Sequence, residues 1–103
     1  MSVFHLEFHP DTSGDYDEAY AWYEDKTEGL GEQFLADVRN KIKVIFANPE
    51  IFSVKSKQGY REAKLDDFPY TVVYRILKKR KVIFISSIHH QSRHPRMKYR
   101  KLV

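Results

Sequence analysis

Cysteine is absent from the 103 residues of this chain. This absence excludes disulfide frameworks, zinc–thiolate sites and thiol nucleophiles, and it agrees with a reducing compartment. Long apolar runs are also missing, since no stretch approaches the roughly 20 apolar residues that a membrane helix needs. The N-terminus has no basic segment followed by an apolar one. We therefore expect a cytoplasmic protein with no membrane partner.

Acidic residues are missing from the last third of the chain, because all 14 Asp and Glu lie at or before Asp67. Residues 1–67 carry 8 Lys and Arg against those 14, a net of −6, whereas residues 68–103 carry 10 and no acid, a net of +10. A field of one sign attracts a polyanion or an acidic partner. A basic tail that is merely solvated explains the same charge run equally well.

What the chain does contain is enough for one hydrophobic core. Apolar residues make up 42% and aromatic residues 15% of the sequence, so the chain can fold without disulfides, metals or a cofactor. A second core could not be built from so few side chains. We expect a single domain over residues 1–103, ending in a basic tail at about residues 91–103 that is either a short helix or unstructured.

The N-terminal residues change from a strand pattern to a helix pattern. Residues 3–8 alternate, with Phe4, Leu6 and Phe8 on one face, which predicts a half-buried strand. Thr12 followed by Asp15 is an imperfect capping box. The pattern predicts a helix over roughly residues 12–26, with an apolar stripe of Tyr16, Ala19, Tyr20 and Tyr23. We expect about three of the four large aromatic residues here to face the sheet: Tyr16, Tyr20, Trp22 and Tyr23.

A second helix is predicted between a glycine turn and a proline. Gly29-Leu30-Gly31 supplies the turn, and Asn48-Pro49 must end the helix. Its wide apolar stripe consists of Phe34, Leu35, Val38, Ile42, Ile45 and Phe46. The turn lacks the length, the lysine and the hydroxyl residue of a nucleotide-binding loop. We therefore expect a helical hairpin, followed by a connector over residues 50–59.

From residue 60 onward the apolar period becomes two. Residues 60–65, 70–77 and 81–88 read as strands joined by short turns, which predicts an antiparallel meander. Two helices must cover one face of the sheet, because otherwise neither their stripes nor the sheet's apolar face would be buried. The predicted fold class is α+β, with element order βααβββ and a two-helix hairpin packed on an antiparallel sheet.

An ordered set of residues spans nearly the whole chain: Tyr20-Ala21-Trp22-Tyr23-Glu24, Gly29-Leu30-Gly31 with Phe34, Asn48-Pro49, Arg61, Phe68-Pro69-Tyr70 with Val73-Tyr74, and Ile88-His89 with Arg93 and Pro95. The set resembles the toxins of the RelE/ParE superfamily, and the βααβββ order is the fold that this resemblance implies. It further implies a toxin of a type II toxin–antitoxin (plasmid stabilisation) module, which inhibits growth unless a cognate antitoxin binds it as a hetero-oligomer.

The resemblance leaves two chemistries to compare. RelE-like members cut messenger RNA in the ribosome, whereas ParE-like members poison DNA gyrase. Glu62 and Lys64 stand where the RelE pattern has two lysines, and a carboxylate repels the phosphate that a lysine would neutralise. Other departures from that pattern are Thr71 for an arginine, Gln91 for a basic residue, and Met97 for a tyrosine that recurs two residues later as Tyr99. The resemblance therefore favours the ParE-like branch.

Candidate site residues follow from these comparisons. A ribonuclease would have to use Lys64, His89, Arg93 and Tyr99. A surface for the target or the antitoxin would use Lys64, Arg75, His89, Arg93, Arg96, Tyr99 and Arg100. Arg61 has the opposite strand parity from Lys64, so it instead contacts the connector or a helix carboxylate. We expect no metal site, because Pro95 disfavours a helix that would align His90 with His94.

The leading hypothesis is a non-enzymatic, ParE-like toxin that acts on DNA gyrase and is neutralised by an antitoxin. The first alternative is a ribosome-dependent endoribonuclease with an altered set of catalytic residues. The second is an inactive relative that survives as a binding module. An exposed charged sheet face that only keeps the protein soluble would explain the basic candidates as well.

Overall fold

The computed structural model of the chain describes residues 3–93 and 98–101. Its elements are β1 (His5–Phe8), α1 (Thr12–Lys26), α2 (Leu30–Ala47), β2 (Arg61–Lys64), β3 (Tyr70–Leu77) and β4 (Val82–His90), with a short 3₁₀ turn at Lys78–Arg80. This order confirms the predicted α+β class and the βααβββ sequence of elements. None of the described helices is long and apolar enough to cross a membrane.

The four strands form one sheet in the order β1-β4-β3-β2. β2, β3 and β4 are antiparallel neighbours, as predicted. β1, however, pairs parallel with β4, with Leu6 opposite Ile83, so the sheet is mixed rather than wholly antiparallel. A parallel partner requires a long crossover connection, and the helical hairpin that follows β1 begins one.

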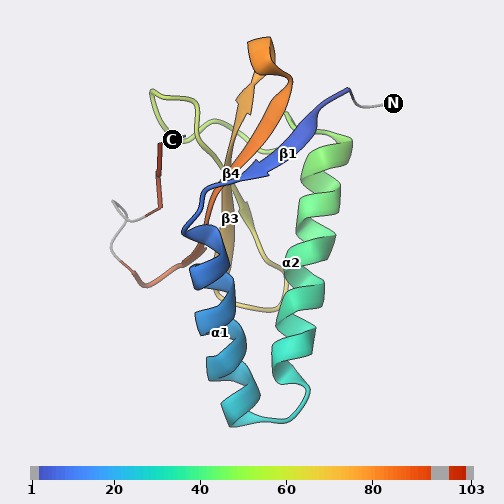
Figure 1. The fold of residues 1–103 in the computed structure, drawn as a ribbon, viewed down its shortest axis with the longest axis vertical. Coiled ribbons are helices and arrows are strands. Elements are labelled where there is room, and N and C mark those ends of the chain that lie inside the picture. The colour runs from blue at the N-terminus through green and yellow to red at the C-terminus, as the bar shows by residue number, and fades with distance from the viewer. Residues whose placement is uncertain (1–2, 94–97, 102–103) are drawn as a thin grey trace.

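Both helices lie side by side over one face of the sheet (Figure 1), which confirms the predicted layering. Phe34 and Val38 of α2 are fully buried against Tyr74 of β3 and Ile85 of β4. Each large apolar side chain removed from water contributes about 1.5–3 kcal/mol to folding. This packing holds the helices on one face of the sheet, and in the described part of the chain the opposite face is free of helices.

The turn between the helices is held by Glu24. Gly29 adopts a left-handed conformation at φ 87°, and its N–H and that of Gly31 each donate to the Glu24 carboxylate at 2.9 Å. A carboxylate at a helix N-terminus satisfies free amides and complements the helix dipole. The helix therefore begins at Leu30, so two of the three predicted turn residues belong to α2.

The predicted capping box at the start of α1 is wrong. Neither Asp11 nor Thr12 caps the helix through its side chain. Instead, the Thr12 hydroxyl donates to the Ser86 carbonyl at 3.3 Å, and Asp15 accepts the Ile88 N–H at 3.1 Å. β1 pairs with β4 only as far as Ile85. The first turn of α1 thus satisfies backbone groups along the part of β4 that β1 does not reach.

The predicted buried face of β1 is only partly correct. Phe4 packs against the core, but 36% of Leu6 and 48% of Phe8 remain exposed. β1 is an edge strand, and the helical layer leaves its later residues partly exposed. Two apolar side chains therefore remain at the edge of the sheet.

The aromatic residues of α1 divide differently from the prediction. Tyr16 and Tyr23 join the core, whereas Tyr20 lies against Gly31 of α2. Trp22 is 57% exposed. The prediction of three residues facing the sheet was therefore too high by one, because the helices approach closely at Gly31 and the Tyr20 ring packs there.

Arg61 confirms its predicted contact with the connector. Its guanidinium donates to the Phe52 carbonyl at 2.6 Å. Tyr74 donates to the Pro49 carbonyl at 2.6 Å from the neighbouring strand. These two bonds tie the segment after α2 to the sheet without regular secondary structure.

Candidate functional site

The sheet face opposite the helices brings together residues that are distant in sequence. Lys64 of β2 pairs with Thr71 of β3, which in turn pairs with His89 of β4. Directly paired residues share a face, and the Cα atoms of adjacent strands lie about 5 Å apart, so Lys64 and His89 are about 10 Å apart in one row. Lys64 is exposed, whereas only 8% of His89 is. Two of the candidate ribonuclease residues therefore share the sheet face opposite the helices.

The C-terminal segment 98–101 docks on β4 at an irregularity in the sheet. The register shifts between Val73 and Tyr74, so that Ser86 on β4 has no direct partner. Such a bulge turns consecutive side chains the same way. Accordingly, the hydroxyls of Ser86 and Ser87 both donate to the Lys98 carbonyl, at 2.7 and 2.9 Å. The end of the predicted basic tail is therefore attached to the sheet.

Glu62 of β2 anchors the same segment on the same sheet face, two strands away from Ser87. Its carboxylate accepts a short hydrogen bond from the Tyr99 hydroxyl and an ion pair from Lys98 Nζ at 2.9 Å. The Tyr99 ring stacks on Tyr60 with centroids 4.7 Å apart, and the Tyr60 hydroxyl donates to the Arg100 carbonyl at 2.6 Å. Tail and sheet are thus joined through side chains and backbone.

The contact between Glu62 and Tyr99 is accompanied by pKa shifts of opposite sign in the two residues. Burial, followed by the hydrogen bond to Glu62, raises the pKa of Tyr99 to about 12. Burial alone would raise the pKa of Glu62, but the hydrogen bonds from Tyr99 and Lys98 outweigh it and hold that pKa below its usual value. At neutral pH the pair is therefore a phenol bonded to a carboxylate.

Arg100 connects the tail to the first helix. Its two terminal nitrogens each lie 2.8 Å from a different oxygen of Asp15, which forms a bidentate pair. Asp15 also accepts the Ile88 N–H, so a single carboxylate joins the tail, α1 and β4. Charge-assisted bidentate pairs are among the stronger hydrogen bonds in proteins.

His89, near the end of β4, is buried. Burial lowers the pKa of its imidazole, and a hydrogen bond between Nε2 and the Arg93 carbonyl at 3.3 Å opposes that effect only in part. The ring is therefore neutral at pH 7. The side chain of Arg93 turns toward α1 and pairs with Glu18 at 2.7 Å.

The four candidate ribonuclease residues lie on β2, on β4 and in the segments that follow β4. In the part of the chain that the structure describes, no hydrogen bond or ion pair joins the side chains of Lys64, His89, Arg93 and Tyr99 to one another. Of the other binding candidates, Arg75 lies over the Tyr60 ring at 5.4 Å. Arg96 falls outside the described residues.

Three acidic residues outside the candidate site residues pair with cations of the C-terminal tail. They are Asp15, Glu18 and Glu62. The signal that could have found them is the charge split itself. A basic tail that carries no acid has to find its ion pairs in the acidic part of the chain. The described residues contain no cluster of three His, Cys, Asp or Glu side chains that could hold a metal ion.

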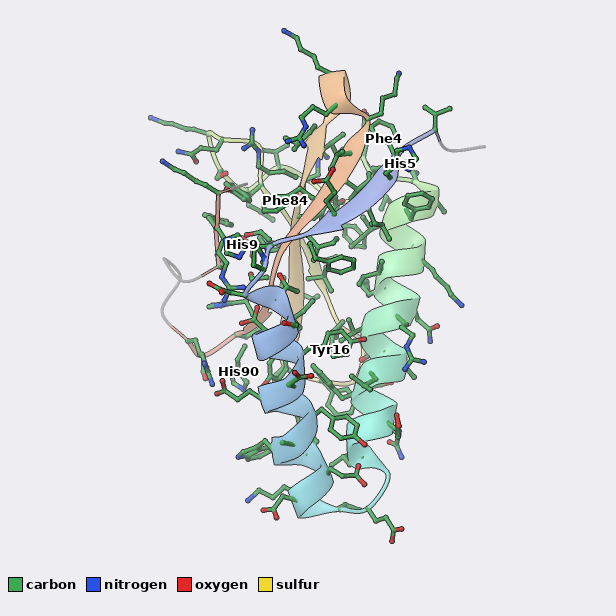
Figure 2. The ribbon with its side chains drawn as sticks, viewed as in Figure 1. Phe4, His5, His9, Tyr16, Phe84 and His90 are labelled. Atoms are coloured by element: carbon green, nitrogen blue, oxygen red, sulfur yellow. The ribbon has the colours of Figure 1, made fainter. Side chains whose placement is uncertain are left out.

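A pocket of about 540 Å³ lies between α1 and the C-terminal half of β4. Trp22 and Glu18 line it on one side, and His90 and Arg93 line it on the other. Figure 2 shows His90 on the side of α1 that faces away from α2, whereas Tyr16 points between the two helices. A second pocket, of about 420 Å³, lies where β1 leads into α1 and is lined by Phe8, Pro10 and Tyr16, among others.

Known structures share this arrangement of elements. The chromosomal ParDE toxin–antitoxin system from P. aeruginosa matches with a TM-score of 0.73 and 20% identity, covering 85% of this chain and 96% of that one. The isolated E. coli RelE toxin matches with a TM-score of 0.64 and 17% identity, over 90% of this chain and 89% of that one. The intact E. coli RelBE toxin–antitoxin complex also matches with a TM-score of 0.64 and 17% identity, over 88% and 100%.

At these identities the structures show the fold. No curated protein matches the chain. A family model does, over residues 6–95, and it describes the ParE toxin of the type II toxin–antitoxin system parDE. That match covers both helices and all four strands except His5, the first residue of β1. The chain therefore belongs to the ParE toxin family, within the RelE/ParE superfamily.

Proposed function

We propose that this ParE-family chain acts on DNA gyrase, does not cleave messenger RNA, and is held inactive in the cytoplasm by a cognate antitoxin. The observation that carries the proposal is the contact between Glu62 and Tyr99 on the sheet face. By resemblance, this face is where a RelE-like toxin would place its catalytic residues.

Phosphodiester cleavage needs positive charge at the phosphate and a proton donor or acceptor of suitable pKa. Glu62 supplies a carboxylate whose pKa is lowered, so it is ionised at neutral pH, and its ion pair with Lys98 at 2.9 Å occupies a cation that could otherwise bind a phosphate. Tyr99 has a pKa raised to about 12, so it is a weak acid there, and its hydroxyl is already bonded to Glu62. This chemistry argues against nuclease activity and favours a function that depends on binding.

The outer edge of β1 supports docking of an antitoxin. The amides of His5 and His9 donate toward β4, so by alternation those of Leu6 and Phe8 point away from it. The exposed side chains of both residues flank this edge, and Phe8 also lines the 420 Å³ pocket. An extended apolar segment of the antitoxin could add to the edge as a further strand. An unpaired apolar edge is otherwise a site of aggregation.

The docking surface can be tested with the cognate antitoxin. We expect Phe8→Asp to weaken the complex at least tenfold in a co-purification or calorimetric titration, because it places a charge in the apolar contact. Val54→Asp changes an equally exposed apolar residue outside β1 and should leave binding unchanged. Unaltered binding of the Phe8 variant would place the antitoxin elsewhere.

The target is tested by inducing the chain alone in a bacterial host while growth, the DNA-damage response and translation are followed separately. We expect growth arrest with a DNA-damage response while translation continues. Early loss of translation would instead indicate the ribonuclease. Undisturbed growth would indicate an inactive relative that retains only binding, and it would contradict the proposal.

One observation favours the ribonuclease as a second candidate, namely the row that holds Lys64 and His89 on one face. Under that alternative, changing Lys64, His89, Arg93 and Tyr99 together would abolish messenger cleavage on ribosomes. If the unaltered chain produces no cleavage in the same assay, this candidate is excluded.

A further inference from the structure

The ten cations of residues 68–103 are not equally available to a partner. Three cations of the C-terminal tail are bound by acids from earlier in the chain: Arg93 by Glu18, Lys98 by Glu62 and Arg100 by Asp15. The last two pairs are mostly buried. In the described part of the tail, most of the positive charge therefore fixes the fold.

The remaining charge gathers at the hairpin between β3 and β4. Lys78, Lys79, Arg80 and Lys81 are consecutive and all exposed. Lys78 pairs with Glu50 at 3.3 Å and Arg80 with Glu7 at 3.7 Å. Pairs between exposed side chains are weak and easily exchanged. We call these four residues the basic hairpin tip.

Two cations of the basic hairpin tip have no acidic partner at all among the described residues, namely Lys79 and Lys81. The tip also has a fixed shape. Its 3₁₀ turn closes with Lys81 in a left-handed conformation at φ 58°, where its N–H donates to the Lys78 carbonyl at 3.2 Å. Figure 1 shows this hairpin projecting beyond the other strands. Four exposed cations are thus held together where the hairpin projects from the sheet.

We propose that the basic hairpin tip binds the phosphate backbone of double-stranded nucleic acid without regard to sequence. Lysine and arginine contacts to phosphates supply this kind of binding, and each contact releases counterions. An acidic protein fits less well, because the cores of protein interfaces are apolar and depleted in lysine. None of the exposed large apolar residues lies in the tip.

The same composition favours a duplex over a single strand. Binding of single strands relies on aromatic side chains on which bases stack. The tip has no aromatic residue. The inference does not depend on gyrase being the target, since it rests only on the placement of charge.

The experiment measures anisotropy of a labelled 24-base-pair duplex titrated with the full chain at several salt concentrations. A DNA duplex and an RNA duplex of the same sequence are titrated separately. Binding of either duplex through the tip supports the proposal, and the duplex that binds identifies the nucleic acid. We expect the logarithm of the affinity to fall with the logarithm of salt concentration by about 0.9 per phosphate contacted.

The double variant Lys79→Gln with Lys81→Asn removes the two unpaired cations, and asparagine tolerates the left-handed backbone at residue 81. This variant should reduce the slope of the logarithm of affinity against the logarithm of salt concentration by about 2. The control is Arg39→Gln with Lys43→Gln, which removes two exposed charges from α2. It should leave the slope unchanged, and circular dichroism verifies that both variants fold.

Equal losses of duplex affinity in the two double variants would overturn the proposal, because the affinity would then depend on net charge alone. Duplex binding that the tip variant leaves unchanged would also overturn it. A polyglutamate peptide serves as the probe for an acidic protein. If it displaces the duplex from the tip more effectively than unlabelled duplex does, the surface is a protein site and the proposal fails.

Discussion

Arg100 and Asp15 form a two-point ion pair in which each guanidinium nitrogen lies 2.8 Å from a carboxylate oxygen. They are 85 residues apart in the sequence. Because Asp15 also accepts the Ile88 N–H, this pair joins residues 98–101, α1 and β4.

Breaking that pair should destabilise the fold. We expect Arg100→Gln to lower the free energy of unfolding by about 2 kcal/mol, because it leaves a mostly buried carboxylate without its strongest partner. Urea unfolding measures the change. Arg80→Gln removes an arginine from the exposed pair with Glu7 and should cost about 0.5 kcal/mol or less. Equal effects of the two substitutions would show that the Arg100 pair is not structural.

The pKa of Glu62 is lowered in the fold, so its contribution to stability is present above the unfolded value of about 4.5 and is lost as the pH falls below it. We therefore expect the unaltered chain to lose more stability between pH 6 and pH 3 than Glu62→Gln does. Urea unfolding at several pH values measures this difference. Glu28→Gln changes an exposed acid and should retain the full acid dependence. Parallel curves for the chain and the Glu62 variant would argue against the lowered pKa.

The two helical glycines tested as alanine should give effects of opposite sign. A Cβ on Gly31 would meet the Tyr20 ring and the Glu24 carboxylate at 2.9 Å, so Gly31→Ala should cost about 1–3 kcal/mol. A Cβ on Gly14 of α1 meets nothing within 4 Å, so Gly14→Ala should stabilise by about 0.5–1 kcal/mol. Thermal unfolding of both variants decides the matter, and a neutral Gly31 variant would contradict the close helix contact.

Burial lowers the pKa of His89, so its ring should titrate below 6.5. The neutral ring contributes stability above the unfolded value, and this contribution is lost as the pH falls toward the folded value. A two-dimensional NMR titration of the imidazole protons follows the ring directly, with His89→Asn assigning the signal. A midpoint above 6.5 would mean that a nearby carboxylate, rather than burial, controls this residue.

Much of the fold could be predicted from the sequence because it depends on local patterns. The apolar stripe of α2, the break at Asn48-Pro49 and the alternation of β3 each describe their own segment, and the structure confirms them. The direction of β1 could not be predicted in this way. It depends on which strand it meets after a crossover, and no local pattern carries that information.

The candidate site was less predictable for the same reason. Lys64 and His89 could be placed on strands, but the partners of Tyr99 and Arg100 lie 37 and 85 residues away. Thr12 and Asp15 illustrate the problem most directly. Their spacing fits a capping box, yet both turn to β4, because an unpaired strand edge competes with the helix end for the same oxygen atoms.

The proposed action of this ParE-family chain on gyrase, and not on messenger RNA, can be tested in vitro. The most direct measurement incubates the purified chain with gyrase and supercoiled plasmid, and in parallel with translating ribosomes. We expect that cleaved plasmid bound to gyrase accumulates, that addition of the antitoxin prevents this, and that the messenger stays intact. Cleaved messenger with unaffected gyrase would contradict it.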